Sequence, residues 1–181
     1  MAQEAYDAAQ PDLLRAAELE PQNARARLHL ATLLTLKGDY QAALQEAAQA
    51  IALEPASSEA RLKAANIRYF LKDHAGAAQD YELAVRHDPA SPPALNGLGL
   101  GYLALGRHPE ALESLSRAIA LNPAAESFHR NRAATYASLK SYANAAAGFR
   151  TARALSGDPA RTEEYDRLIE ACEARLEGGA P

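Results

Sequence analysis

Four evenly spaced prolines constrain what this chain can fold into more than any other feature. Pro21, Pro55, Pro89 and Pro123 follow one another at intervals of 34 residues, and each closes an apolar phrase: AAELEP, AIALEP, AVRHDP and AIALNP. A fixed period of this length is typical of stacked structural repeats, in which each unit buries its apolar face against its neighbours. The sequence therefore predicts an array of short repeats.

Each repeat is predicted to be a pair of helices. Apolar residues recur at helical spacing within each period, and the spacing breaks once near its middle, for example at KGDY (37–40). Gly38 is placed to end a first helix, and Asp39 to cap a second. The glycines of NGLGLGYLALG (96–106) fall inside a first helix, where they would allow close packing. The predicted repeats are 24–57, 58–91, 92–125 and 126–159.

Small residues occupy fixed positions in the predicted second helices. A larger side chain at these positions would push neighbouring helices apart, so we expect them to be buried at helix contacts. Two positions of the repeat show this pattern, one occupied by Ala43, Ala77, Ala111 and Ala145 and the other by Ala50, Ala84, Ala118 and Ala152.

These residues resemble the tetratricopeptide repeat family. The resemblance implies an all-α fold, a right-handed superhelical α-solenoid of helix-turn-helix repeats, and a non-catalytic scaffold or adaptor for protein–protein interaction. Arg68 and Arg132 depart from the family pattern at normally apolar positions, and we expect both side chains to be solvated. The third repeat matches best, with Leu98, Gly99, Tyr102, Gly106, Ala111, Ala118 and Pro123.

The two ends of the predicted single domain, 1–181, differ from the repeats. Residues 4–23 fit only the second half of a repeat, with Ala9, Leu13, Ala16, Leu19 and Pro21 in place. Either this is an unusual cap, or the chain was excised from a longer array, which we favour. Residues 160–177 are predicted to form a capping helix, whose apolar stripe consists of Tyr165, Leu168, Ile169, Cys172 and Leu176.

No catalytic or metal-binding pattern stands out. The five histidines never fall three or four residues apart, and the single cysteine, Cys172, has no second thiol for a disulfide or a metal site. We therefore expect no enzyme activity and no cofactor. The net charge of −4 disfavours nucleic acid as a partner, and no apolar run is long enough for membrane insertion. A soluble, cytoplasmic protein is the expectation.

Recognition is predicted on the first helices, which line the concave side in the resembling family. Their segments 24–37, 58–71, 92–105 and 126–139 carry +3, +2, 0 and +1, although the whole chain carries −4. Leu28, Leu62, Tyr69, Leu100 and Leu103 are interpreted as an apolar floor, with core packing as the alternative. The predicted groove residues are Arg25, Leu28, His29, Thr32, Leu62, Lys63, Asn66, Tyr69, Asn96, Leu100, Leu103, Arg130 and Asn131.

Three hypotheses of function follow. The favoured partner is a protein or peptide segment with apolar anchors and acidic residues, held in the groove. Alternatively, the N-terminal half-repeat could accept a helix from another copy, which would make the protein a homo-oligomeric scaffold. The third hypothesis is the recognition arm of a larger multidomain enzyme.

Overall fold

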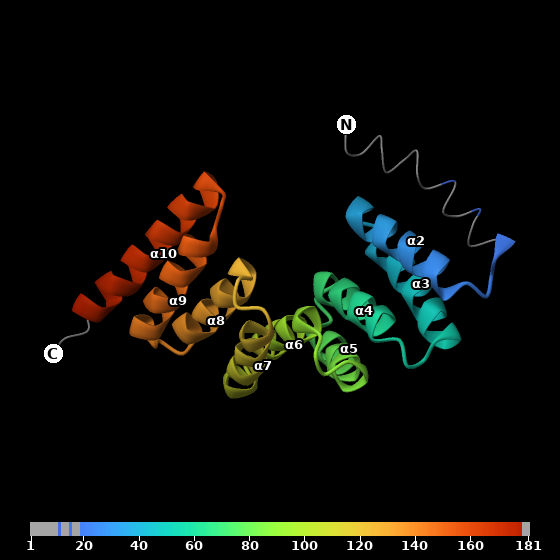
Figure 1. Ribbon diagram of the computed structural model, residues 1–181, viewed down its shortest axis with the longest axis horizontal. Coiled ribbons are helices and arrows are strands. Elements are labelled where there is room, and N and C mark those ends of the chain that lie inside the picture. The colour runs from blue at the N-terminus through green and yellow to red at the C-terminus, as the bar shows by residue number, and fades with distance from the viewer. Residues whose placement is uncertain (1–10, 12–14, 16–18, 179–181) are drawn as a thin grey trace. The chain divides into compact units, whose positions relative to one another are not determined.

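The described part of the chain is helical, without strands, which confirms the predicted all-α class (Figure 1). The computed structural model describes residues 11, 15 and 19–178. Ala9, Leu13 and Ala16 of the predicted half-repeat lie outside the described residues. The helices are α2 (Ala24–Lys37), α3 (Tyr40–Leu53), α4 (Ser58–Phe70), α5 (His74–His87), α6 (Pro92–Ala104), α7 (His108–Leu121), α8 (Glu126–Ser138), α9 (Tyr142–Leu155) and α10 (Pro159–Glu177).

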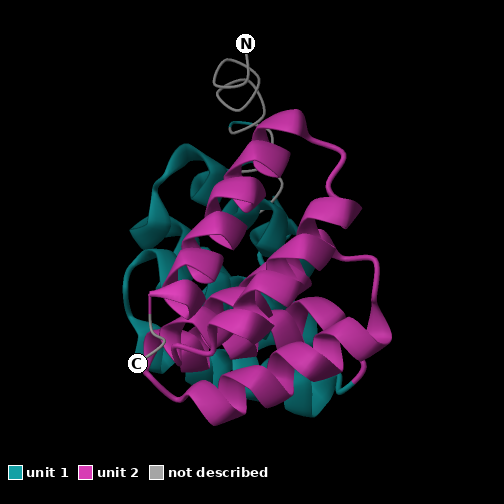
Figure 2. Ribbon diagram, turned by 90° about the vertical axis from the view of Figure 1, so that its left-hand side faces the viewer, with its two compact units in different colours: residues 1–89 teal, residues 90–181 magenta. Residues whose placement is uncertain are grey.

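The helices form two compact units, which meet between Pro89 and Ala90 in the sequence (Figure 2). In unit 1, α2 pairs with α3 and α4 pairs with α5; in unit 2, α6 pairs with α7, α8 pairs with α9, and α10 packs on α9. Within the units, α2 also contacts α4 and α6 contacts α8. The first helices of consecutive pairs therefore lie side by side in each unit. The single domain and its repeat boundaries stay predictions.

The turn inside each helix pair requires a left-handed backbone. Gly38 and Gly106 adopt φ values of 84° and 73°, and the N–H of Gly38 bonds the carbonyl of Thr35. Lys72 and Lys140 occupy the corresponding turns with φ values of 65° and 57°, a conformation that residues with a Cβ rarely adopt. Asp39 then caps α3 by accepting a hydrogen bond from the N–H of Ala42. The roles predicted for Gly38 and Asp39 are confirmed.

The repeated alanines lie in the core, as predicted. All eight have no exposed surface. In unit 1 the core also contains Leu30 and Ile67, with 1% and 2% of their surface exposed, and in unit 2 it contains Leu115 and Tyr165, with 0% and 1%. Because these alanines have only a methyl group at the helix contact, the helices can approach closely and bury the larger side chains around them.

Gly99 on α6 lies at a close contact between two helices. A Cβ at Gly99 would lie 2.5 Å from Cγ of Leu115 on α7, which is closer than two carbon atoms can approach without a shift. Gly99 is buried, and Leu115 packs directly onto its backbone. The prediction that the glycines of 96–106 allow close helix packing is confirmed at this position.

Arg68 lies outside the core, with 33% of its side chain exposed, but its head group is bound by a buried carboxylate. Its Nη1 lies 2.5 Å from Oδ2 of Asp80 on α5, and Nη1 of Arg61 lies 3.0 Å from the other carboxylate oxygen. The side chain of Asp80 is only 3% exposed. Both arginines of α4 therefore tie this helix to α5, an ion pair that the sequence analysis did not predict. Arg132 donates to Oγ of Ser116 on α7 at 3.4 Å.

Candidate functional site

The predicted groove residues of unit 1 come from α2 and α4, and the two helices are directly linked on this face. Nζ of Lys63 donates a hydrogen bond to Oγ1 of Thr32 at 2.9 Å, and the Thr32 hydroxyl donates to the carbonyl of Leu28 at 2.7 Å. We call this surface the unit 1 face. It consists of Arg25, His29, Thr32, Leu62, Lys63, Asn66 and Tyr69.

Asn66 has an exposed side-chain amide whose orientation is fixed by a hydrogen bond from α5. The hydroxyl of Tyr81, on α5, donates to Oδ1 of Asn66 at 2.6 Å. Burial raises the pKa of Tyr81 far above its ordinary value, so the hydroxyl keeps its proton and remains a donor. The amide nitrogen of Asn66 is then directed away from Tyr81. Beside it, the ring of Tyr69 makes an edge contact with His74 at 5.1 Å between centroids.

Leu28 belongs to the core rather than to the floor of a groove. It is 5% exposed and packs in one buried cluster with Ala24, Ala50 and Ala60. The interpretation of Leu28 as an apolar floor residue is therefore wrong, because its surface is already covered by α3 and α4. Leu62 and Tyr69 are half-buried, so part of each side chain is still open to solvent.

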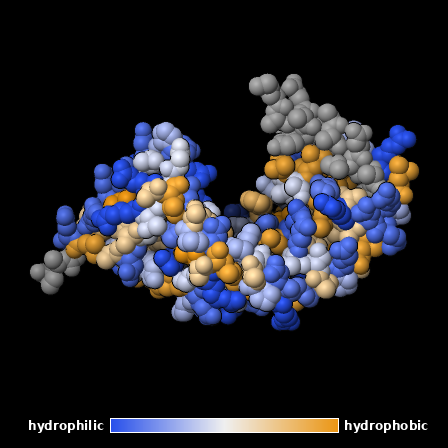
Figure 3. Space-filling view, in the orientation of Figure 1, coloured by the Kyte–Doolittle hydropathy of each residue, from blue (hydrophilic) through white to orange (hydrophobic). Residues whose placement is uncertain are grey.

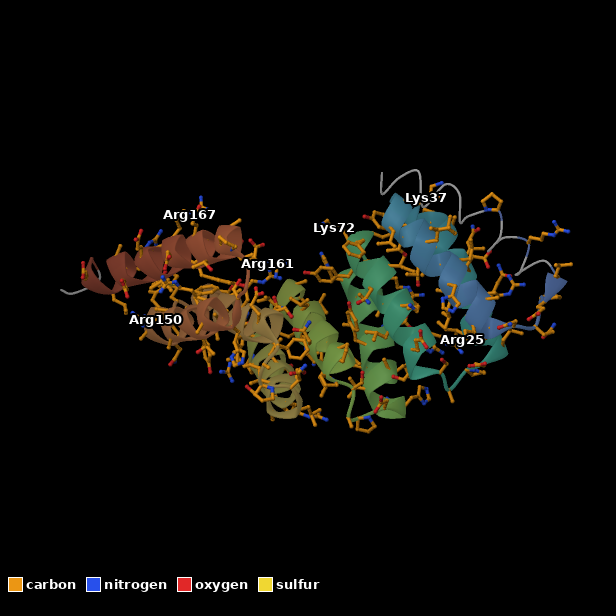
Figure 4. All side chains as sticks on the ribbon, turned by 45° about the horizontal axis from the view of Figure 1, so that its top comes forward. Arg25, Lys37, Lys72, Arg150, Arg161 and Arg167 are labelled. Carbon is orange, nitrogen blue, oxygen red and sulfur yellow. The ribbon has the colours of Figure 1, made fainter. Side chains whose placement is uncertain are left out.

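Three of the six Lys and Arg side chains on the first helices of unit 1 point at the second helices. Nη1 of Arg27 lies 3.0 Å from Oε2 of Glu46 on α3, and Arg61 and Arg68 bind Asp80 on α5. Arg25 lies near the start of α2, away from these pairs, and is exposed (Figure 4). Lys63 and Arg25 therefore carry the positive charge of the unit 1 face, and Nζ of Lys63 also lies 3.7 Å from Oε1 of the exposed Glu59 on the same helix.

Unit 2 shows a second link between consecutive first helices. Nδ2 of Asn131 on α8 donates to Oδ1 of Asn96 on α6 at 2.9 Å, and Asn131 is 7% exposed. Leu100 and Leu103 on α6 and Arg130 on α8 are half-buried. Asn131 was predicted to line the groove but is buried, so the accessible residues Asn96, Leu100, Leu103 and Arg130 form what we call the unit 2 face. Hydrophobic and hydrophilic residues are mixed over the surface of each unit in the view of Figure 3.

Glu126 fastens α10 to the start of α8. Nη1 of Arg161 donates to both carboxylate oxygens of Glu126, at 3.2 and 2.9 Å, and the hydroxyl of Tyr165 donates to Oε1. Figure 4 shows Arg161 at the beginning of α10, beside the start of α8. Burial and the bond to Glu126 raise the pKa of Tyr165 to about 12, so this donor keeps its proton. The N-terminal part of α10 is therefore held firmly.

This attachment is expected to weaken in acid. Burial alone would raise the pKa of Glu126, but the hydrogen bonds from Tyr165 and Arg161 outweigh it and lower the pKa below its usual value. A carboxylate with a lowered folded-state pKa stabilises the fold above its unfolded pKa, and this contribution is lost as the pH falls through the folded value. Because intrinsic amide exchange itself slows in acid, the quantity to measure is the protection of the α10 amides relative to those of α6, which should decrease below about pH 4.

A Glu126→Gln variant is the control for this acid effect. Its amide cannot titrate, so the exchange of α10 relative to α6 should be nearly independent of pH between about pH 6 and about pH 3. If the variant and the original chain show the same relative acceleration of α10, Glu126 is not the group responsible.

The structure also contains a hollow that sequence reasoning missed. It has a volume of about 360 Å³ and lies between α8, α9 and α10. The sequence predicts Leu168 only as part of the apolar stripe of a capping helix, and that stripe does not include Ala171 or Arg175. We call this feature the α10 hollow. Its lining residues are Ala134, Ala137, Tyr142, Phe149, Leu168, Ala171, Cys172 and Arg175.

Two exposed apolar residues at helix ends were also missed. Leu36 at the end of α2 is 56% exposed, and Phe70 at the end of α4 is 52% exposed. The Phe70 ring stacks on Tyr40 with 5.3 Å between centroids, which joins the two helix pairs of unit 1. The sequence could have indicated this pair, because Leu36 and Phe70 are apolar residues at the same position of consecutive repeats, 34 residues apart.

The described residues offer no group of three or more His, Cys, Asp or Glu side chains that could hold a metal ion. None of the described helices is long and apolar enough to cross a membrane. What the arrangement provides is two polar, partly apolar faces and one apolar hollow, all suited to contacts with another molecule.

Comparisons with known proteins agree with this picture. A tetratricopeptide repeat model matches residues 1–52 and 37–92, and a TPR repeat model matches residues 101–140. No curated protein sequence matches the chain significantly.

Solved structures share the fold at low sequence identity. A thermophilic TPR protein of Thermus thermophilus is 23% identical, with a TM-score of 0.79 over 93% of this chain and 92% of that one. PilF of Pseudomonas aeruginosa is 20% identical, with a TM-score of 0.77 over 99% and 87% of the two chains. YrrB, described as a TPR protein with an unusual peptide-binding site, is 20% identical, with a TM-score of 0.72 over 92% and 84%.

Proposed function

The chain belongs to the tetratricopeptide repeat family, and from this premise we propose that it is a non-catalytic scaffold that binds a protein segment on its first helices. The observation that carries the proposal is a hydrogen bond between predicted groove residues of consecutive first helices in each unit. Lys63 bonds Thr32 in unit 1, and Asn131 bonds Asn96 in unit 2. Side chains from two repeats thus contribute to one surface in each case.

The partner segment on the unit 1 face is proposed to carry acidic residues beside apolar anchors. Lys63 and Arg25 supply positive charge, and Asn66 supplies an amide held by Tyr81, which suits backbone or carboxylate oxygens. Half-buried Leu62 and Tyr69 offer apolar contact between these polar groups. The likeness in fold to YrrB, whose description names a peptide-binding site, supports a peptide as the ligand.

Charge reversal tests this proposal. A variant with Arg25→Glu, Lys63→Glu and Arg130→Glu is used as bait in a quantitative pull-down, beside the original chain. Proteins captured by the original chain through acidic segments should fall by about tenfold or more, because each lost charge-assisted bond costs about 1.5–3 kcal/mol. Circular dichroism should show the same helix content in both baits.

The matched control reverses three exposed arginines elsewhere. Arg86 on α5, Arg117 on α7 and Arg167 on α10 give the same change in net charge when replaced with Glu. This control should capture partners as the original chain does. Equal losses in the two variants, or no loss in either, would show that partners do not bind through Arg25, Lys63 and Arg130.

A further inference from the structure

We propose that the α10 hollow is a separate binding site, and that it takes a partner segment presenting a large apolar side chain next to a carboxylate. This proposal rests on the proposed function, because it assumes that the protein binds other proteins. It adds a site on the last helix of the array, outside the two faces described above.

The shape and lining of the hollow suit one bulky apolar group. Its volume of about 360 Å³ lies near the lower end of the range of about 300–1,000 Å³ that is usual for ligand pockets. Phe149 and Cys172 are 3% and 6% exposed, Leu168 is half-buried, and Ala171 and Arg175 are exposed. This gradient places apolar groups deep in the hollow and the arginine at its edge.

The walls of the hollow are held in place before any ligand arrives. Glu126 fastens the start of α10 to α8, as described above. Further along, Ile169 and Cys172 of α10 pack in one buried cluster with Ala146 and Phe149 of α9. A site with fixed walls loses less conformational entropy on binding than a flexible one.

Arg175 gives the site its preference for a carboxylate. The residues one turn before it, Ala171 and Cys172, are not acidic, and no ion pair to Arg175 exists among the residues that the structure describes. By contrast, Asp166 and Glu173 of the same helix are bound by arginines of α9. A guanidinium at the edge of an apolar hollow binds a carboxylate with two parallel hydrogen bonds.

The test uses hydrocinnamate, a phenyl group on a short chain that ends in a carboxylate, and its uncharged amide, hydrocinnamide. Amide NMR spectra of the isotope-labelled full chain are recorded during titration to millimolar concentrations. Hydrocinnamate should shift the amide signals of Leu168, Ala171 and Cys172. Hydrocinnamide should bind about tenfold more weakly, because it cannot form the charge-assisted bonds.

Three variants test whether hydrocinnamate binds in the α10 hollow. Ala171→Trp places a large side chain in the hollow and should abolish the shifts, whereas Ala174→Trp, on the same helix but outside the lining, should leave the affinity within about twofold. Arg175→Gln should reduce the affinity for hydrocinnamate to that for hydrocinnamide. The spectra of each variant also show whether it is folded.

Several outcomes would overturn the proposal. One is the absence of shifts in the original chain, and another is equal binding of the two probes. A third is a dimer in sedimentation velocity that Ala171→Trp converts to a monomer, because a second copy would then occupy the hollow. An Arg25→Glu, Lys63→Glu variant should bind hydrocinnamate normally, so failure of the unit 1 face and failure of the hollow are separate results.

Discussion

Replacing Asp80 with alanine is expected to lower the free energy of unfolding by about 3–5 kcal/mol. Asp80 is 2% exposed and is the common partner of Arg61 and Arg68. Without it, the partly covered guanidinium group of Arg61 loses its carboxylate partner, and that of Arg68 keeps only Asp73, whose Oδ2 lies 3.9 Å from Nε. The loss of one partner from a buried ion pair costs more than the intact pair contributes, because the remaining charge is poorly solvated.

The measurement is urea unfolding followed by circular dichroism, combined with hydrogen exchange resolved by helix. Exchange should accelerate in α4 and α5 and change little in α8 and α9, since the repeats of such arrays are coupled mainly to their neighbours. Glu110→Ala is the control, because Glu110 pairs with Arg107 on the surface, where such pairs contribute about 1 kcal/mol or less. An Asp80→Ala variant no less stable than Glu110→Ala would contradict this account.

The prediction of the fold from sequence succeeded because the relevant signals are local and repeated. Gly38 is required by the left-handed turn, Asp39 by the free N–H groups at the start of α3, and Ala43 by the close approach of two helices. The left-handed turn and the buried alanine return in every period, whereas the side-chain cap is made by Asp39 and Asp73 and is absent at Arg107 and Ser141. One repeat of this sequence would leave the fold ambiguous. The recurrence of similar residues at a period of 34 identifies a repeat fold.

The prediction of the binding surface was less successful because it depends on where long side chains end. The charge summed over the first helices includes Arg61 and Arg68, although their guanidinium groups reach back to Asp80 on the second helix. Arg27–Glu46 and Arg61–Asp80 occupy the same two positions of consecutive repeats, 19 residues apart, so this pairing recurs with the period. The pairing of Arg68 with Asp80, 12 residues apart, does not recur among the ion pairs of the described residues. Leu28 was misplaced for a related reason, because its burial is decided by α3 and α4.

The α10 hollow escaped prediction because α10 breaks the period. It is 19 residues long, whereas the first helices of the repeats have 13 or 14. Glu126 of α8 binds Arg161 and Tyr165 of α10, which lie 35 and 39 positions further along the chain. Neither separation equals the 34-residue period, so the repeat pattern does not predict these bonds. Features made by such terminal helices have to be found from the structure.

The contact between Gly99 and Leu115 leads to the second large effect. Leu115→Ala removes a fully buried side chain and should cost about 2–5 kcal/mol of unfolding free energy. Gly99→Ala adds a methyl group that would lie 2.5 Å from Cγ of Leu115, so we expect it to cost about 1–3 kcal/mol. Alanine alone would favour the helix by about 1 kcal/mol over glycine, and the collision has to outweigh that gain.

The double variant Gly99→Ala, Leu115→Ala decides whether the collision is the cause. With the leucine side chain shortened, the added methyl group has room and fills part of the cavity, so the two costs should not add. We expect the double variant to be more stable than the sum of the single variants by about 0.5–3 kcal/mol, measured by urea unfolding. Strictly additive costs would show that the destabilisation caused by Gly99→Ala does not come from a collision with Leu115.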